Sequence, residues 1–175
     1  MLSRGLEMGG DGLRDVMAVR YDEQMGLRLT ENFWTEEFSC RCPKLRQAQD
    51  SDFCNGAVRI GPLFDLILPL QRLRSIVGPL VIESGFRCWA YHKWLYKHET
   101  KGRAVTKNSA HLHGLAADVW PKLGVIEETE DNIAILRQCG FKGVGWRLGQ
   151  LENKLHLDVM DRGGRPGVLT QWHYA

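Results

Sequence analysis

The chain has 175 residues, enough for one domain, and 43% of them are apolar, which allows a well-packed core. Charged residues make up 25%, and 23 Lys and Arg stand against 21 Asp and Glu, a balance that argues against a partner such as nucleic acid or an anionic membrane. The apolar stretch 60–70 is interrupted by Pro62, Asp65 and Pro69 and is too short to span a bilayer, so we expect no membrane insertion. Residues 1–20 have no apolar segment of signal-peptide type, and we therefore expect a soluble protein that is not exported by the usual route.

Residues 1–29 are Gly-rich and weakly periodic, and we expect an N-terminal arm or leader ahead of one domain over 30–175. The first clear element of that domain is a helix, because apolar residues recur at three- and four-residue steps from Leu63 to Val77. Pro69 predicts a kink or a late start in this helix. The remaining expected segments are a buried strand over 80–82, a helix over 89–97, a flexible loop over 97–108 and a helix over 129–138.

Two later segments alternate strictly between their two faces, which predicts strands with one buried face. In 114–119 one face carries Leu115, Ala117 and Val119, and the other carries Gly114, Ala116 and Asp118. In 154–159 one face carries Leu155, Leu157 and Val159, and the other carries Lys154, His156 and Asp158.

The polar faces of these strands, with His111 just before the first, carry residue types that bind metals. If the strands pair, His111, Asp118 and His156 converge on one point. Two imidazoles and one carboxylate make a catalytic zinc set, because three protein ligands leave a fourth position for water. The small residues Gly114 and Ala116 would leave room above the sheet for the metal and a substrate. Each ligand residue taken alone is also compatible with an ordinary surface or core position, and we expect His113 not to be a ligand.

A resemblance to a known family rests on several motifs in order along residues 30–172. The run Ser109-Ala110-His111-Leu112-His113-Gly114-Leu115-Ala116-Ala117-Asp118 fits S-x-H-x-x-G-x-A-x-D. Glu83 to Cys88 contains an S-G-[YF]-R segment, and Gly143-Val144-Gly145-Trp146 precedes His156-Leu157-Asp158-Val159. Together they resemble the D-alanyl-D-alanine carboxypeptidase and L-alanyl-D-glutamate endopeptidase family of murein zinc peptidases. The segment Glu37-Phe38-Ser39-Cys40-Arg41-Cys42 resembles phage-associated members.

The resemblance implies Zn2+ on His111, Asp118 and His156. It also implies that Arg87 faces the substrate, where its guanidinium would bind a carboxylate or a developing oxyanion. Ser109 and Trp146 would complete the substrate contacts. The alternatives are a salt bridge near a turn for Arg87 and a turn-capping hydroxyl for Ser109.

The general base is where the sequence departs from the family. Many members have a carboxylate three residues before the last zinc histidine, and here that residue is Asn153, which cannot accept a proton. Asp158 and Glu152 are the two candidates for this role, and we favour Asp158 because it shares a strand face with His156. The alternative for Asp158 is a partner that steadies His156 or Arg87. If neither carboxylate reaches the water, the protein is a weak or inactive peptidase.

Five cysteines are present, and an odd count argues against a disulfide framework. Cys139 lies in a helical segment and reads as a buried apolar residue. Cys40, Cys42 and Cys54 lie in a turn-rich region and form either a metal knot, with Cys88 as fourth ligand, or separate buried thiols. Their spacing lacks the paired C-x-x-C of typical zinc sites.

The strand and helix patterns predict an α+β fold, with a small antiparallel sheet that carries zinc on one face and helices around it. The resemblance implies that this fold is of the hedgehog or D-Ala-D-Ala peptidase type. We expect an enzyme that cleaves peptidoglycan stem peptides, as an endopeptidase or a D,D-carboxypeptidase. Because murein lies outside the cytoplasm, we expect a phage endolysin in the host cytoplasm before lysis, or a virion-associated wall hydrolase. The alternative is an inactive structural or host-recognition component of a virion, docked to other virion proteins through the N-terminal arm.

Overall fold

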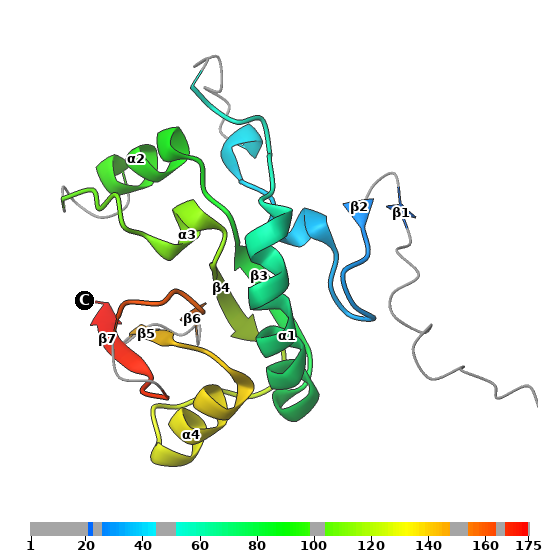
Figure 1. Cartoon of the computed structure of the whole chain (residues 1–175), viewed down its shortest axis with the longest axis vertical. Helices are drawn as coiled ribbons and strands as arrows, with labels where there is room; N and C mark the ends of the chain where they lie inside the picture. The colour runs from blue at the N-terminus through cyan, green and yellow to red at the C-terminus, as the bar shows by residue number, and fades with distance from the viewer. Residues whose placement is uncertain are drawn as a thin grey trace, which may run out of the picture.

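The computed structural model describes residues 21–22, 26–44, 52–98, 104–147, 154–163 and 167–174. Two short strands and two 3-10 helices precede the main elements, and Figure 1 shows how they are arranged. These early elements are β1 (Tyr21–Asp22), β2 (Gly26–Leu27), η1 (Thr35–Phe38) and η2 (Cys42–Lys44). The helices are α1 (Ile60–Val77), α2 (Trp89–His98), α3 (Ala110–His113) and α4 (Glu130–Cys139). The remaining strands are β3 (Leu80–Ser84), β4 (Ala116–Pro121), β5 (Gly143–Arg147), β6 (Leu155–Asp158) and β7 (Thr170–Tyr174).

Helix α1 follows the predicted apolar stripe. Leu63, Ile67, Leu70 and Leu73 are buried, as three- and four-residue spacing requires for one face of a helix. Pro69 lies inside the helix and is buried, and the helix continues through it to Val77. Proline therefore neither ends nor delays α1, because packing of the stripe on the core outweighs the one backbone hydrogen bond that Pro69 cannot make.

The central sheet has five strands in the order β3-β4-β6-β5-β7. The first three pairings are antiparallel, and β7 pairs with β5 in parallel. The predicted α+β class is confirmed, with one difference: the sheet is mixed rather than wholly antiparallel. The difference lies in the last strand: after β6 the chain crosses to the far side of β5, where β7 runs parallel to β5 at the edge of the sheet.

The two faces of the sheet have different roles. One face carries Ala117, Val119, Val144 and Leu157, which belong to the main hydrophobic cluster together with residues of α1 and α4. The opposite face carries the polar side chains of β4 and β6. In Figure 1 helices α2 and α3 lie together at one end of the molecule, away from α4. Helices α1 and α4 thus cover one face, and residues of α2 lie beside the polar side chains Asp118 and His156 of the other.

The strand predicted over 114–119 begins two residues later than expected, at Ala116. Residues 110–113 form α3, and Gly114 ends this helix with a left-handed backbone at φ 72°. A Cβ at Gly114 would also lie 2.9 Å from the Cβ of Arg59. Glycine is therefore required at position 114 by the left-handed turn and by the nearby side chain of Arg59. The expectation that its small size leaves room for a metal was wrong.

Most of the expected N-terminal arm and part of the expected loop over 97–108 lie outside the described residues, which omit 1–20, 23–25 and 99–103. The described part of residues 1–29 includes Leu29, which is buried in the main cluster. Among the described helices, none has both the length and the apolar character needed to cross a bilayer.

Candidate metal centre and cleft

Three elements bring the predicted ligand residues together. His111 lies in α3, Asp118 in β4 and His156 in β6, and the antiparallel register places Asp118 directly opposite His156. Oδ1 of Asp118 lies 3.1 Å from Nε2 of His111 and 3.1 Å from Nδ1 of His156. The two imidazole nitrogens are 3.0 Å apart. The three ligand atoms thus converge on one point, as the alternation of the strands predicted.

The second nitrogen of each imidazole is held by a partner outside this trio. Nδ1 of His111 donates to the carbonyl oxygen of Gly85 at 2.7 Å. Nε2 of His156 donates to Oδ2 of Asp158 at 3.1 Å. These contacts fix both rings with the remaining nitrogen turned toward Asp118, which is how metal-binding histidines are oriented in proteins.

Burial and neighbouring charges set the protonation of this cluster. Burial, with the positive charge of Arg87, lowers the pKa of His111 to about 4. Although burial opposes it, the charges of His111 and Arg87 hold the pKa of Asp118 well below its usual range. The pKa of His156 is raised, because hydrogen bonds to Asp118 and Asp158 outweigh burial. At neutral pH His111 is therefore neutral and Asp118 ionised, which are the forms that bind a cation.

A cation would fit this donor set. Two imidazole nitrogens and one carboxylate oxygen, all within 4.8 Å of one another, match the three-ligand composition of a catalytic zinc site. His113 is not part of the group, as expected.

Arg87 lies at the rim of the cluster. Its Nη2 pairs with Oδ2 of Asp118, and its Nε donates to Oγ of Ser84 at 2.9 Å. The salt bridge that the sequence left open as an alternative is thus present. It also holds the guanidinium beside the candidate metal position, where an anionic group of a ligand would meet it.

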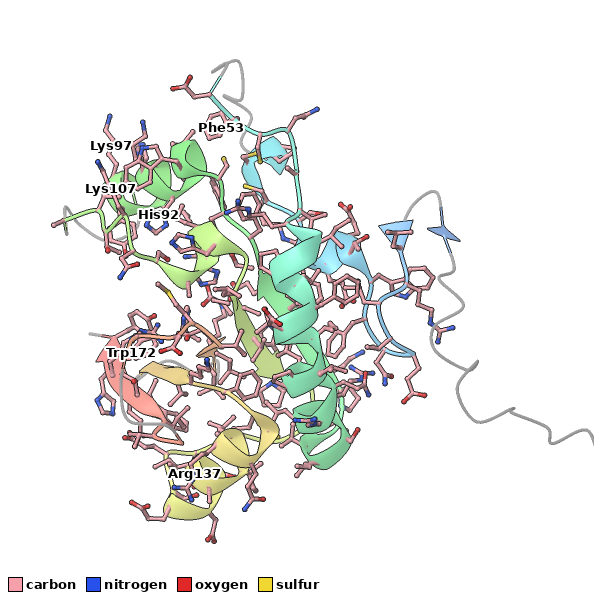
Figure 2. The ribbon with its side chains drawn as sticks, viewed as in Figure 1. Phe53, His92, Lys97, Lys107, Arg137 and Trp172 are labelled. Carbon is pink, nitrogen blue, oxygen red and sulfur yellow. The ribbon has the colours of Figure 1, made fainter. Side chains whose placement is uncertain are left out.

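A cleft of about 380 Å3 opens above the cluster. Strand β3, helix α2 and strand β7 provide most of the other walls. Figure 2 labels His92 on α2 and Trp172 on β7, the elements that contribute Tyr91, Leu95, Tyr96 and Tyr174 to the lining. The residues that line the cleft are Glu83, Ser84, Arg87, Tyr91, Leu95, Tyr96, Ser109, His111, Asp118, Lys154, Leu155, His156 and Tyr174.

Asp158 lies behind His156 rather than in the cleft. Its side chain is fully buried, and Arg162 grips both carboxylate oxygens at 2.7 and 2.6 Å. The backbone N–H of Met160 donates to Oδ1 at 3.1 Å. Although burial opposes ionisation, the hydrogen bonds from His156 and Arg162 lower the pKa of Asp158 to about 2. These contacts favour the steadying role over the proton-accepting role.

The other predicted site residues have different fates. Ser109 lines the cleft and makes no capping hydrogen bond to α3 through its side chain. Glu152 lies outside the described residues. Trp146 is buried in the main core, and its Nε1 donates to Gln171. It is not brought to the cleft, because alternation along β5 turns Val144 and Trp146 to the core face of the sheet.

Sequence reasoning missed the aromatic wall of β7. The rings of Trp172 and His156 lie 5.2 Å apart, and that of Tyr174 lies 6.5 Å from His156. Burial and the negative charge of Asp118 raise the pKa of Tyr174 to about 12. Arg162 lies over the ring of Trp172 at 5.3 Å. Gly145 of β5 faces this wall, whereas Gly143 faces Asp158 and Arg162, and the G-x-G spacing was the signal available in the sequence.

The fold and the cluster thus define an α+β protein with a candidate His-Asp-His metal centre in a cleft. No family model matches the chain, and no curated protein matches it. Among solved structures it is similar to the Serratia marcescens L-Ala D-Glu endopeptidase ChiX, with 24% identity. The match covers 61% of this chain and 83% of that chain, with a TM-score of 0.38. At that score the two structures do not superpose closely enough to identify what this chain does.

Proposed function

We propose that this protein is a zinc-dependent peptidase that cleaves the stem peptides of peptidoglycan. The observation that carries the proposal is the convergence of His111, Asp118 and His156 beside Arg87 at the floor of a cleft. The same residues stand at the matching positions of the murein peptidase motifs in the sequence.

His111, Asp118 and His156 would hold the zinc. When bound, it would supply Lewis-acid polarisation of the scissile carbonyl and lower the pKa of a water molecule. Arg87 would place its positive charge against the substrate, as a donor to a carboxylate or to the carbonyl oxygen as negative charge develops. Ser84 would keep Arg87 in place through its hydrogen bond to Nε.

A proton acceptor must also reach the cleft. Among the described residues, the carboxylates that line it are Asp118, which belongs to the metal cluster, and Glu83. Oε1 of Glu83 accepts from Nζ of Lys154 at 2.7 Å across the cleft wall. We therefore propose Glu83 as the proton acceptor, with Glu152 as the second candidate, and give Asp158 the task of orienting His156.

The cleft is suited to a peptide with charged groups. Arg87 and Lys154 present positive charge, whereas Tyr91, Tyr96 and Tyr174 offer rings with polar tips. Stem peptides of peptidoglycan carry carboxylates and short apolar side chains, which such a lining would bind. Both an endopeptidase and a D,D-carboxypeptidase remain within the proposal.

The test is digestion of purified peptidoglycan by the zinc-loaded full chain, with products identified by mass spectrometry. We expect either new amino termini within the stem or free D-alanine, and these products distinguish an endopeptidase from a carboxypeptidase. Asp118→Asn and His156→Ala should abolish release, and His113→Ala, two residues from a ligand but outside the cluster, should retain it. An absence of fragments from every peptidoglycan type tested, with zinc bound, would refute the proposal.

The biological setting that we propose is a bacteriophage, as a free endolysin or a wall hydrolase of the virion. This rests on the resemblance of residues 37–42 to phage-associated members of the family. A non-enzymatic virion component is the second candidate, because the carboxylate favoured from the sequence, Asp158, is fully engaged by Arg162 and His156. Co-sedimentation with virion proteins together with a lack of peptidoglycan cleavage would favour that candidate.

A further inference from the structure

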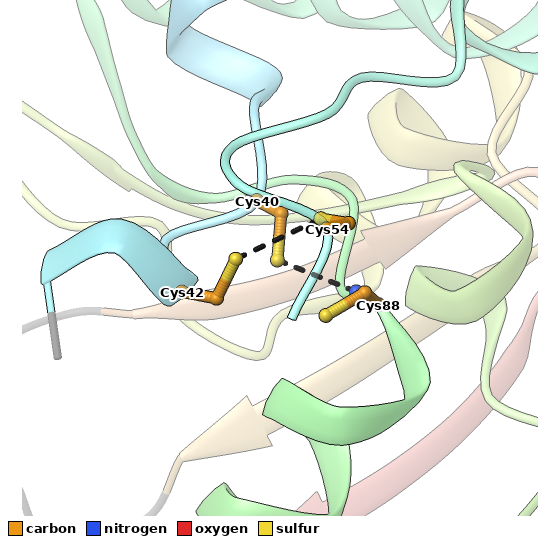
Figure 3. A group of neighbouring side chains, drawn as sticks. All are labelled: Cys40, Cys42, Cys54 and Cys88. Carbon is orange, nitrogen blue, oxygen red and sulfur yellow. Dashed lines mark hydrogen bonds between the residues drawn. The ribbon is translucent and has the colours of Figure 1, made fainter. Parts of the chain in front are cut away.

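Four of the five cysteines gather at one point, far from each other in the sequence. Cys40 follows η1, Cys42 begins η2, Cys54 lies in the turns before α1, and Cys88 directly precedes α2. Their sulfur atoms all lie within 4.8 Å of one another, and Figure 3 shows the four side chains pointing toward a common centre. The fifth cysteine, Cys139, is buried separately in the main core.

The spacing of the sulfur atoms suits a tetrahedral metal and not a disulfide. Zn–S bonds of about 2.3 Å in a tetrahedron place neighbouring sulfur atoms about 3.8 Å apart. The Sγ atoms of Cys42 and Cys54 are 3.7 Å apart, and all four thiols are free. A disulfide would need about 2.05 Å between two sulfur atoms. An all-sulfur tetrahedral set favours zinc over hard cations such as magnesium or calcium.

The surroundings of the quartet are those of a closed structural site. Cys40, Cys42 and Cys88 are buried, and Phe53 and Phe86 pack against the group. Backbone N–H groups point at the sulfur atoms: Cys88 donates to Cys40 Sγ at 3.3 Å, and Tyr91 donates to Cys88 Sγ at 3.5 Å. Such donors stabilise thiolates, which are the form that binds a metal.

From this arrangement we propose that Cys40, Cys42, Cys54 and Cys88 bind one zinc ion in a structural site, separate from the His-Asp-His cluster. On binding, each of the four thiols loses its proton to solvent and donates a sulfur lone pair to the ion, and no oxidation state changes. In the described part of the lead-in segment 33–55, regular structure is limited to the short helices η1 and η2. A metal would supply the stability that such a segment cannot obtain from its own core.

The zinc site would connect the segment 33–55 to the segment 85–88, which carries Arg87. Cys88 follows Arg87 directly, and Phe86 donates its backbone N–H to the carbonyl of Phe38 at 2.9 Å. The carbonyl of Gly85, in the same segment, accepts from His111. Zinc bound by the four cysteines would therefore fix the position of Arg87 and the orientation of the His111 ring. This effect on activity rests on the proposed function, whereas the binding of zinc by the cysteines does not.

The experiment measures metal binding directly on the full chain. Native mass spectrometry should find two zinc ions per chain, and one in the double variant His111→Ala and His156→Ala. In this variant, cobalt replacing the remaining zinc should give the intense sulfur-to-cobalt charge-transfer absorption of a thiolate site. Cys54→Ser should weaken or shift that absorption, and Cys139→Ser should leave it unchanged. Because these experiments measure metal binding and not peptidase activity, a double variant that binds no zinc would overturn the cysteine site and leave the proposed function standing.

A second measurement needs no variant and so does not depend on folding of the cysteine mutants. In the zinc-loaded wild type, the quartet should react with a thiol reagent only after a strong chelator is added. Equal reactivity before and after chelation would overturn the proposal. A loss of two or four hydrogens in the mass of the non-reduced chain, which marks disulfides in place of zinc, would overturn it as well.

Discussion

Asp158 is fully buried directly behind His156, with its Oδ2 3.1 Å from Nε2 of the imidazole. The opposite nitrogen of the same ring, Nδ1, lies 3.1 Å from Asp118. One imidazole thus connects a buried carboxylate to the candidate metal position. In this relationship Asp158 fixes the tautomer of His156 and increases its basicity as a ligand, while Arg162 balances the charge of Asp158.

Replacing this carboxylate should weaken both metal binding and folding. In Asp158→Asn the ion pair with Arg162 is lost while Arg162 can still reach solvent, which should cost about 1–3 kcal/mol in the free energy of unfolding. Loss of the contact to His156 should lower zinc affinity at the His-Asp-His cluster about 10- to 100-fold. Urea denaturation and competition with a zinc chelator measure the two effects.

The matched control is Asp161→Asn, three residues further along. Asp161 is exposed and pairs with Lys142 at 3.5 Å. Its replacement should leave zinc affinity and the urea midpoint unchanged, because exposed ion pairs contribute little. Equal behaviour of the two variants would mean that Asp158 does not support His156.

The candidate metal centre could be predicted from the sequence for a definite physical reason. Alternation with period two assigns each strand residue to a face, and it placed Asp118 and His156 on the polar faces of two strands. Antiparallel pairing then needed only the correct register, which sets Asp118 opposite His156. The group of four cysteines could be predicted only as one of two alternatives, because its members come from three separate segments that tertiary packing brings together.

The wall formed by β7 could not be predicted in this way. Thr170 to Tyr174 form an edge strand with a mostly exposed burial pattern, and Trp172 and Tyr174 are too few alternating positions to indicate a strand from the sequence. Its parallel pairing with β5 depends on the path of the chain after β6 and not on local sequence. The ion pair between Arg162 and Asp158 was missed for a related reason, because it depends on the turn after β6.

The proton acceptor can be identified by comparing three carboxyl-to-amide variants under the same conditions. We expect Glu83→Gln to lower kcat about 10²- to 10⁴-fold with the zinc content unchanged, as for loss of a general base. Glu152→Gln should retain most of the activity, and Asp158→Asn should lose activity together with zinc. A loss confined to Glu152→Gln would transfer the role to that residue, and full activity in both glutamine variants would exclude proton transfer by either.

His92 gives the fold a dependence on pH that is separate from the metal centre. The side chain is fully buried, its Nε2 donates to the carbonyl of Thr106 at 3.1 Å, and Nδ1 is a buried atom without a hydrogen-bond partner among the described residues. Burial, with the positive charge of Arg87, lowers the pKa of His92. The unfolded chain, with a histidine pKa of about 6.5, therefore takes up this proton first as the pH falls.

The stabilising contribution of neutral His92 is complete above about pH 6.5 and is lost as the pH falls through the folded-state pKa. We expect the free energy of unfolding to fall as the pH is lowered below about 6.5, and less steeply in His92→Gln than in the wild type. NMR titration, with the His92 resonance assigned from this variant, measures the pKa directly. A midpoint at or above 6.5 would contradict the expectation.

The glycine at 145 should be intolerant of even one added methyl group. A Cβ there would lie 2.7 Å from Nε1 of Trp172 and would also meet the ring of Tyr174. Gly145→Ala should therefore displace the wall that packs on His156 and lower the free energy of unfolding by about 1–3 kcal/mol, as overpacking does. Zinc affinity at the His-Asp-His cluster should fall with it, because the ring of Trp172 helps to fix His156.

Gly61 in α1 is the matched control for the same chemical change. A Cβ at Gly61 meets nothing within 4 Å, and its backbone is helical. Gly61→Ala should stabilise the fold by up to about 1 kcal/mol, because alanine loses less backbone entropy in a helix. The two substitutions should thus shift the urea midpoint in opposite directions. A stabilising shift in both would show that β7 moves aside freely at position 145.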